Sequence, residues 1–310
     1  MEKRAGERPA TVGGVRIVSL LPSTTEILFA LGAGDQIVGV TFECDYPPEA
    51  RQRRIVSTST LPPGLPPAEV DRLVTERMRA GEDLYHLDRG ALSGLEPDLV
   101  VTQDLCAVCA VDVSEVSDAL AYLGCRAEVL TIDPHRLAEV LESITTLGRA
   151  TGTSAPATEL VSALSGRLAA VRERVAGRPR PRALVLEWTD PPFAPGHWVP
   201  EMVIAAGGEC VLGEPGERSF RTTWEAVRAA APDVVVCAPC GFDLPAAARL
   251  TESVLATGAL PAGVPVWAVD ANASFARPGP RLVDGVEALA GIFHPAVAGP
   301  PAPALARRLA

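Results

Sequence analysis

Short apolar runs alternate along this chain with longer segments whose apolar residues recur every three or four positions. Such patterns predict buried strands and amphipathic helices, respectively. The expected strands are residues 15–20, 37–40, 99–102, 127–130, 183–186, 234–237 and 266–269. The expected helices are residues 23–31, 68–79, 114–123, 134–150, 155–176, a helix from 200, 224–230, 244–256 and 281–293, with a Pro-rich irregular stretch at 51–67. Strands that alternate with helices indicate parallel sheets.

The two halves of the chain repeat one another. Residues 16–22 and 182–188 each place a basic residue before an apolar run, and a Gly-ended helical segment follows both. Residues 97–101 and 232–236 both read as Pro-Asp followed by three apolar residues. A repeat of this kind predicts two similar α/β lobes with parallel sheets, which enclose a cleft.

The helix expected at 155–176 is long enough to connect the lobes. At about 1.5 Å per residue it would reach roughly 30 Å, the size of a small domain. The expected organisation is therefore a disordered N-terminus at 1–14, a lobe at 15–153, the connecting helix at 154–177, a second lobe at 178–294 and a frayed tail at 295–310. The helix at residue 23 is expected to open with a capping box formed by Ser23 and Glu26.

Composition narrows the classes of function. The chain has 310 residues, 47% of them apolar, and a formal net charge of −10. This charge, without a cluster of Lys and Arg, argues against nucleic acid or an anionic membrane as partner. No apolar run reaches the length of a membrane span, so membrane insertion is not expected. A charged start without a secretion signal, together with seven cysteines, predicts a cytoplasmic location.

The sequence lacks the characteristic motifs of several enzyme classes. It contains no Gly-x-Ser-x-Gly element, no phosphate-binding loop ending in Gly-Lys-Ser/Thr, and no Gly-x-Gly-x-x-Gly after a strand. Serine hydrolases of that type, P-loop enzymes and dinucleotide-dependent enzymes are therefore not expected.

The candidate ligand-binding residues follow the expected strands. In open α/β sheets the ligand lies beyond the carboxyl ends of the strands. The residues predicted to bind a ligand there are Ser23, Thr24, Phe42, Glu43, Cys44, Gln103, Asp104, Trp188, Phe193, Trp198, Glu201, Phe242, Phe275 and Arg277.

Three aromatic residues in this group, Trp188, Phe193 and Trp198, fall within eleven positions of one another. They are suited to clamp a flat macrocycle between their faces. The alternative is that they pack the first strand of the second lobe against the helix behind it. Glu201 is either a cleft carboxylate or a partner of the helix dipole. Arg277 is suited to a carboxylate or phosphate.

Two Cys-x-x-Cys pairs follow corresponding strands of the two lobes, Cys106 with Cys109 and Cys237 with Cys240. Cys106, Cys109, Cys240 and His197 are the candidate metal ligands, because thiolates with imidazole suit zinc or iron. A thiolate of low pKa is the alternative, as a nucleophile. Simple packing is the competing interpretation, and it is favoured for Cys237, Cys125 and Cys210.

The segments at 16–26, 44–48, 96–103 and 190–193 together resemble the periplasmic binding protein family that serves vitamin B12 and iron-siderophore transporters. The resemblance covers about residues 15–293. It implies a class III solute-binding clamshell, with two Rossmann-like lobes, one rigid connecting helix and a large ligand between the lobes. The segments at 102–111, 187–201 and 240–243 resemble a subgroup described as cobalamin-binding, which implies a corrinoid ligand.

The sequence departs from this family at several positions. Members that deliver to a transporter carry one docking glutamate on each lobe, whereas Gly90 or Ala91 and Ile204 stand at those places here. Docking to a transporter is therefore not expected. Glu43 and Gln103 replace residues that are aromatic in B12-binding relatives.

Three functional hypotheses remain open. The first is a cytoplasmic binding protein for a corrinoid or related metallo-macrocycle, without turnover. The second is an enzyme that uses a Cys/His/Glu site in the same cleft, either with a bound metal ion or without one. The third is a substrate-binding subunit of an ABC transporter.

Overall fold

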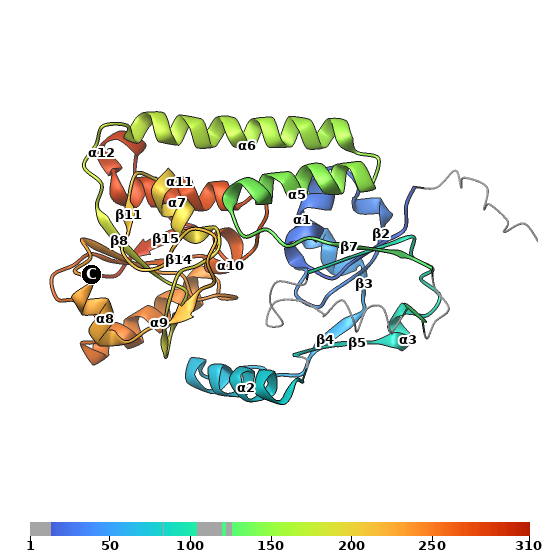
Figure 1. Cartoon of the computed structure of the whole chain (residues 1–310), viewed down its shortest axis with the longest axis horizontal. Coiled ribbons are helices and arrows are strands. Elements are labelled where there is room, and N and C mark those ends of the chain that lie inside the picture. The colour runs from blue at the N-terminus through green and yellow to red at the C-terminus, as the bar shows by residue number, and fades with distance from the viewer. Residues whose placement is uncertain (1–13, 83, 104–119, 122–125) are drawn as a thin grey trace, which may run out of the picture.

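The chain folds into two lobes, each built around a five-stranded sheet (Figure 1). The structure, a computed structural model, describes residues 14–82, 84–103, 120–121 and 126–310. The expected disordered N-terminus and the helix expected at 114–123 fall almost wholly outside the described residues. The two-lobed α/β architecture predicted from the repeat is confirmed.

The sheet of the N-terminal lobe has the order β3-β2-β1-β6-β7, and all its strands are parallel. Its centre, β1, pairs residue Ile17 with Ile37 on one side and with Leu99 on the other. The central strands β1 and β6 are buried along their whole length because helices and loops cover both faces of the sheet. Its strands are β1 (Ile17–Ser19), β2 (Ile37–Val40), β3 (Arg54–Ile55), β6 (Leu99–Thr102) and β7 (Glu128–Thr131).

The sheet of the C-terminal lobe has the order β11-β8-β13-β14-β15. Only β15 runs antiparallel, pairing Trp267 with Arg308 and Val269 with Ala306. The expectation of a frayed tail is therefore wrong, because the last residues satisfy their backbone groups on the edge of β14. The strands are β8 (Arg182–Leu186), β11 (Glu209–Cys210), β13 (Val234–Cys237), β14 (Val266–Val269) and β15 (Ala306–Arg308), and the short helix α12 (Pro295–Ala298) precedes β15.

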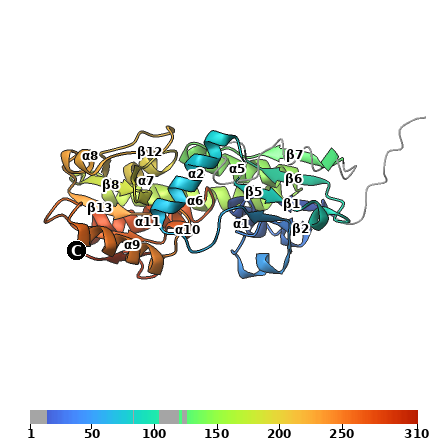
Figure 2. The ribbon, with the colours of Figure 1, turned by 90° about the horizontal axis from the view of Figure 1, so that it is seen from below.

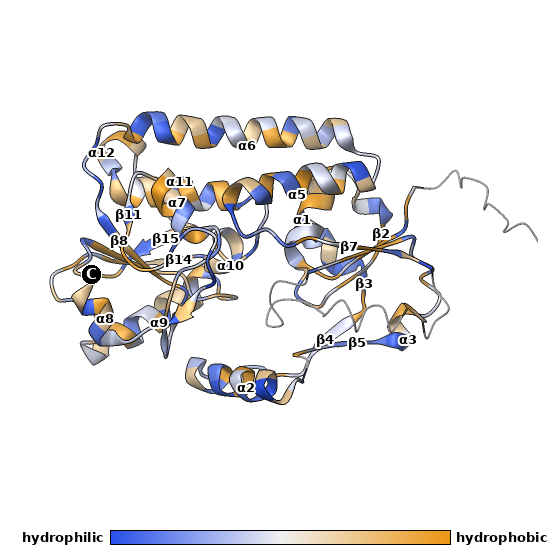
Figure 3. Cartoon of the chain, in the orientation of Figure 1, coloured by the Kyte–Doolittle hydropathy of each residue, from blue (hydrophilic) through white to orange (hydrophobic). Residues whose placement is uncertain are grey.

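One layer of helices packs on both sheets and joins the lobes (Figure 1). A single apolar cluster runs from Ile17 in the first sheet, through Leu168 of α6, to Val236 in the second sheet. Figure 3 shows the apolar residues concentrated in the sheets and in helices such as α7 and α11. The layer consists of α1 (Pro22–Ala30), α5 (Leu137–Ala150), α6 (Ser154–Val175), α7 (Val199–Ala205) and α11 (Leu282–Phe293).

Helix α6 is the predicted connecting helix. It has 22 residues and spans both lobes (Figure 1). Its buried stripe includes Leu164, Leu168 and Val171, as its helical spacing predicts. On its flank the Arg167 guanidinium binds Asp284 and Glu287 of α11, with Nε 3.0 Å from the Glu287 carboxylate. A packed helix with charged ties to its neighbour makes the connection between the lobes stiff.

Helix α2 (Pro67–Ala80) leaves the N-terminal lobe and lies against the other side of the molecule (Figures 1 and 2). It is inserted between the strands of a hairpin, β4 (Ser57–Ser59) and β5 (Tyr85–Leu87). No residue of α2 is buried. The stretch expected to be irregular at 51–67 thus contains β3 and β4, strands too short to leave a periodic signal.

The remaining elements are a small third sheet and several further helices. A second sheet of the C-terminal lobe combines β9 (Trp188–Thr189), β10 (Pro192–Ala194) and β12 (Phe220–Arg221). The other helices are α3 (Arg89–Leu92), α8 (Trp224–Ala229), α9 (Leu244–Thr257) and α10 (Ala271–Ser274). Of the helices that the structure describes, none combines the length and the apolar character of a membrane-spanning segment.

Candidate functional site

The loops after β2 and β14 come from different lobes and meet between them. Arg277, which follows α10, donates from Nη2 to the Glu43 carbonyl oxygen at 3.2 Å. The same guanidinium binds the Asp45 carboxylate through Nη1. Because both loops stand at the carboxyl ends of parallel strands, their meeting point is where ligands bind in this class of fold.

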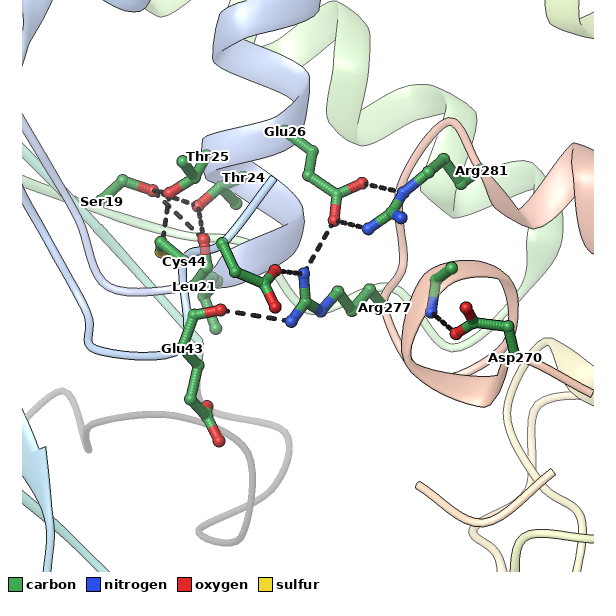
Figure 4. A network of polar contacts seen from close by, with 12 residues as sticks. Ser19, Leu21, Thr24, Thr25, Glu26, Glu43, Cys44, Asp270, Arg277 and Arg281 are labelled. Carbon is green, nitrogen blue, oxygen red and sulfur yellow. Dashed lines mark hydrogen bonds and ion pairs between the residues drawn. The ribbon is translucent and has the colours of Figure 1, made fainter. Parts of the chain in front are cut away.

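Glu26 is the centre of an ion-pair network across this junction (Figure 4). Its Oε1 lies 3.2 Å from Arg277 Nη1, and its Oε2 accepts from Arg281 Nε at 2.9 Å. The Glu26 side chain is only 2% exposed. Asp45 adds a second carboxylate, so two carboxylates face two guanidinium groups. A buried charge is tolerated when it is paired in this way.

The capping box expected for Glu26 is wrong. Helix α1 begins at Pro22 with Leu21 as the N-cap residue, and no side chain caps it. Ser23 therefore lies inside the first turn instead of before it. The Glu26 carboxylate consequently reaches across to the other lobe and does not bend back onto its own helix.

Asp45 and Arg281 also stabilise the junction. Burial raises the pKa of Asp45, but the hydrogen bond and charge of Arg277 outweigh it and hold the pKa below its ordinary value. The Arg281 guanidinium stacks over the Tyr46 ring, 4.0 Å from its centroid. Sequence reasoning missed Asp45, Tyr46 and Arg281, because partners more than two hundred positions apart leave no local signal.

Two predicted ligand residues of the N-terminal lobe, Thr24 and Cys44, belong to the core. Thr24 Oγ1 lies 2.7 Å from Ser19 Oγ and 3.1 Å from the Leu21 carbonyl oxygen. The Cys44 Sγ lies 3.0 Å from Thr25 Oγ1, and burial raises its pKa to about 12. We therefore correct both assignments: these side chains close a buried hydrogen-bond network (Figure 4).

Two predicted aromatic walls, Trp198 and Phe275, are also core residues. Trp198 is 6% exposed and Phe275 is 2% exposed. The indole Nε1 of Trp198 donates to the Phe275 carbonyl oxygen at 2.8 Å. The packing alternative therefore holds for Trp198, and the assignment of both residues as ligand walls is corrected.

Three aromatic side chains of the C-terminal lobe are half-buried and not part of the core: Trp188, Phe193 and Phe242. The Trp188 and Phe242 rings lie 5.6 Å apart between centroids. Trp188 Nε1 donates to the Asp190 carbonyl oxygen at 3.1 Å and to the Pro67 carbonyl oxygen at 3.3 Å. Phe193 is half-buried beside the guanidinium of Arg221. The contact with Pro67 places the Trp188 group under the first turn of α2.

A matching group stands on the N-terminal lobe. Phe42 is half-buried, with its ring centroid 5.9 Å from that of Tyr85. The Tyr85 hydroxyl donates to the Glu43 carboxylate at 3.3 Å. Burial raises the pKa of Glu43, and the nearby Arg277 only partly offsets this. Its carboxylate points away from the ion-pair network (Figure 4). Gln103, which directly follows β6, is buried.

Helix α2 connects the two aromatic groups. Val74 packs against the apolar cluster that contains Tyr85, and Pro67 contacts Trp188. The Asp71 carboxylate binds Arg221 of the other lobe. We call α2 with these contacts the strap. Since none of its residues is buried, the strap is held by few interactions.

Glu201 has a structural role in this arrangement. Its Oε1 lies 3.0 Å from Arg136 Nη1, and its Oε2 accepts from the backbone N–H of Leu137 at 2.7 Å. The carboxylate thus caps the start of α5 and ties it to α7. Of the two alternatives expected for Glu201, partnership with a helix N-terminus fits the geometry, though the helix is α5 and not its own.

The predicted metal ligands are only partly covered by the described residues. Cys106 and Cys109 lie outside them, as do Asp104, which was predicted to bind the ligand, and Cys125, which was predicted to be a packing residue. His197 is half-buried, and Cys240 is exposed. Among the described residues there is no group of three or more metal-binding side chains. The Cys/His site with zinc or iron stays a prediction.

Cys237 and Cys210 were expected to be packing residues, and their surroundings agree. Cys237 is buried in the second sheet, and burial raises its pKa to about 12. Cys210 Sγ donates to the Leu212 carbonyl oxygen at 2.9 Å, and burial raises its pKa to about 12 as well. Neither thiol is a ready nucleophile.

Glu187 is a titratable residue of the C-terminal lobe that was not among the predicted site residues. Its Oε1 accepts from the backbone N–H of Gly196 at 3.2 Å. Burial raises the pKa of Glu187 to about 7, although this hydrogen bond and one with Ser219 lower it. The carboxyl therefore changes charge near neutral pH.

Two cavities lie elsewhere. One, of about 260 Å³, is lined by Val171, Arg174 and the C-terminal residues 298–305. The other, of about 480 Å³, lies around Arg178, Arg180 and His294. Neither includes a residue of the aromatic groups or of the strap.

Two sheets that share one stiff helix, with polar and aromatic side chains converging from both lobes, define a two-lobed small-molecule-binding protein. Residues 17–263 match the family described as periplasmic binding protein. The chain belongs to this family, as the resemblance of its sequence motifs implied.

Curated relatives carry two kinds of name. The chain is 27% identical over 286 residues to a cobalamin-binding protein of Halobacterium salinarum, a match that covers 90% of this chain and 69% of the relative. It is 30% identical over 161 residues to an uncharacterized ABC transporter substrate-binding lipoprotein, YvrC, of Bacillus subtilis. That match covers 51% of this chain and 41% of the relative.

Solved structures share the fold. A periplasmic heme-binding protein from Pseudomonas aeruginosa superimposes with a TM-score of 0.67 at 20% identity, covering 96% of this chain and 95% of the other. The periplasmic vitamin B12-binding protein BtuF of Vibrio cholerae superimposes with a TM-score of 0.61 at 22% identity, covering 89% and 95%. Both bear out the class III two-lobed fold.

Proposed function

We propose that this protein binds a corrinoid, a cobalamin-like ligand, between its lobes without chemical turnover. The observation that carries the proposal is a pair of aromatic groups that the strap connects across the lobes: half-buried Phe42 with the buried Tyr85, and half-buried Trp188 with half-buried Phe242. Large flat rings bind well to aromatic faces, which offer area at little entropic cost. The name of the Halobacterium relative supports the choice of corrinoid.

The ion-pair network supports a mode of binding in which the two lobes do not move far apart. The ion pairs among Glu26, Asp45, Arg277 and Arg281 join the lobes. Separating the lobes would expose or unpair these charges, and breaking a buried pair costs several kcal/mol. Ligand entry is therefore expected at the strap, which buries no residue.

The binding test compares ligands of the family on one purified protein. Cyanocobalamin, hemin and a ferric hydroxamate siderophore are each titrated while the absorbance of the ligand and the fluorescence of the tryptophans are recorded. The proposal expects saturable one-to-one binding of cyanocobalamin at micromolar or lower concentration. Preferential binding of hemin or the siderophore would mean that the proposed ligand is wrong, although the proposed site would stand.

The enzyme hypothesis has one specific observation in its favour. Glu187, with a pKa of about 7, could exchange a proton at neutral pH. The thiols of Cys44, Cys210 and Cys237 do not support a nucleophilic mechanism, because burial raises their pKa values to about 12. Recovery of unmodified cyanocobalamin after prolonged incubation, checked by mass spectrometry, supports binding; a modified corrinoid would favour the enzyme.

We propose a cytoplasmic location and no docking to a transporter. The odd number of cysteines supports the former, and the non-acidic residues at Gly90, Ala91 and Ile204 support the latter. Ile204 is 45% exposed on α7. Fractionation of the native host and affinity capture with membranes test both points. Recovery in the envelope fraction together with a permease would favour the substrate-binding subunit of an ABC transporter.

A further inference from the structure

His135 and His197 face one another across the two lobes. His135 lies in the loop between β7 and α5, and His197 lies in the loop between β10 and α7. Their ring centroids are 5.8 Å apart, and the ring planes make an angle of 44°. Both residues are half-buried.

The backbone holds His197 in an unusual conformation. Its φ is +51°, in the left-handed region. Its N–H donates to the Glu217 carbonyl oxygen at 2.6 Å, and its carbonyl oxygen accepts from Gly216 N–H at 2.9 Å. A Cβ on Gly196 would lie 2.0 Å from the backbone nitrogen of Ser219, so only glycine allows this loop contact. Such strain in a residue other than glycine persists only where the surroundings fix it, and it is found preferentially at functional sites.

His135 is fixed from the other side. Its backbone N–H donates to the Glu139 carboxylate at 2.6 Å, at the start of α5. The same turn is tied to the C-terminal lobe by Glu201, which binds Arg136 and the backbone of Leu137. The backbone positions of the two histidines are therefore fixed by contacts of their own loops.

The imidazole nitrogens of both residues are free to bind a ligand. Within the described residues, no hydrogen bond or ion pair uses a ring nitrogen of His135 or His197, although the rings have aromatic contacts. Burial, together with the charges of His135 and Arg218, lowers the pKa of His197. Metals are coordinated by the neutral form of imidazole.

We propose that His135 and His197 together bind one divalent transition-metal ion of the class that prefers imidazole: zinc, copper or nickel. With metal–nitrogen bonds of about 2.1 Å, two coordinating imidazoles place their ring centroids roughly 5 to 6.5 Å apart, and the observed separation falls in this range. No third protein ligand stands among the described residues. Water or a bound molecule fills the remaining positions, and the ion joins the two lobes.

The test is a metal titration of untagged, chelator-treated protein by isothermal calorimetry with Zn²⁺ and, separately, Ni²⁺. The wild type is expected to bind one ion per chain with micromolar affinity. His135→Ala and His197→Ala are each expected to weaken binding at least tenfold. His86→Ala, at an exposed histidine of β5, is the matched control and keeps the wild-type affinity.

Two further measurements keep the outcome decisive. Circular dichroism establishes that each variant is folded, and melting curves with and without metal should show a stabilising shift for the wild type, His86→Ala and Cys240→Ser, but not for the variants of His135 and His197. Cys240→Ser distinguishes this site from the cysteine-containing one expected from the sequence. Absence of binding, or binding that depends on Cys240 but survives both histidine substitutions, overturns the proposal.

Discussion

The Glu26 carboxylate and the Arg277 guanidinium form a buried ion pair between the two lobes, with 3.2 Å between Oε1 and Nη1, although 251 positions separate the residues in the chain. Arg281 binds the same carboxylate, and Asp45 binds the same guanidinium. The junction of the lobes is therefore polar, and its charges compensate one another only while the lobes stay together. This relationship makes the lobes one mechanical unit.

Glu26→Gln should destabilise the protein strongly. The substitution removes the carboxylate that binds Arg281 and leaves Arg277 paired with the Asp45 carboxylate, and removing one partner of a buried pair costs roughly 3 kcal/mol or more. Urea unfolding followed by circular dichroism measures the change. Arg72→Ala is the control, because Arg72 forms only exposed ion pairs on α2, and such pairs contribute about 0–1 kcal/mol. Equal stability of Glu26→Gln and wild type would show that the network does not hold the lobes.

Acid should loosen the same junction. Asp45 has a pKa below its ordinary value because of Arg277. A lowered pKa contributes stability that is present above the unfolded value, about 3.9, and is lost as the pH falls through the folded value. Unfolding curves between pH 3 and pH 6 should therefore show a loss of stability below about pH 4 that is smaller in Asp45→Asn. An unchanged slope in the variant would remove Asp45 from this role.

Glu187 should act in the opposite direction. Its pKa of about 7 is raised by burial, so the folded state keeps a proton that the unfolded chain releases near pH 4.3. The free energy of unfolding then falls as the pH rises from about 4.3 to 7 and levels off above it, by roughly 3 to 4 kcal/mol in total. Glu187→Gln should abolish this dependence, and Glu209→Gln, at an exposed ion pair, should retain it.

The strap should be released by a single substitution in the other lobe. Arg221→Ala removes the ion pair with Asp71, and few other contacts hold α2, so local opening should become more frequent. Limited trypsin digestion should then cut after Arg77 or Arg79 several-fold faster than in the wild type. Arg228→Ala, at an exposed local ion pair on α8, serves as control. Equal cleavage rates in all three proteins would mean that the ion pair does not restrain the strap.

Much of the fold could be predicted from the sequence. The strands at 37–40, 99–102, 234–237 and 266–269 were placed to the residue, and α6 within one residue of each end, because buried strands and a long amphipathic helix have strong periodic signals. β15 and the sheet of β9, β10 and β12 were missed. Their strands have two or three residues, and tertiary contacts decide their pairing.

The site was harder to predict. The rule that ligands lie beyond strand ends selected Arg277 and Glu43, which meet across the lobes. It could not separate residues that face the region, such as Phe42, from those that turn into the core, such as Trp198. It also did not select Asp45, Arg281 and His135, whose partners lie in the other lobe.

The central claim is that a corrinoid is held between the lobes by aromatic side chains of both. Its most direct test is the dissociation constant of cyanocobalamin for the wild type, for Trp188→Ala and for Phe42→Ala, with Trp224→Phe, behind the second sheet, as the control. The expected result is measurable binding that each alanine substitution weakens about tenfold or more, equivalent to about 1.4 kcal/mol, and that the control retains. Absence of binding by the folded wild type, or affinity that is unchanged in both alanine variants, would contradict the claim.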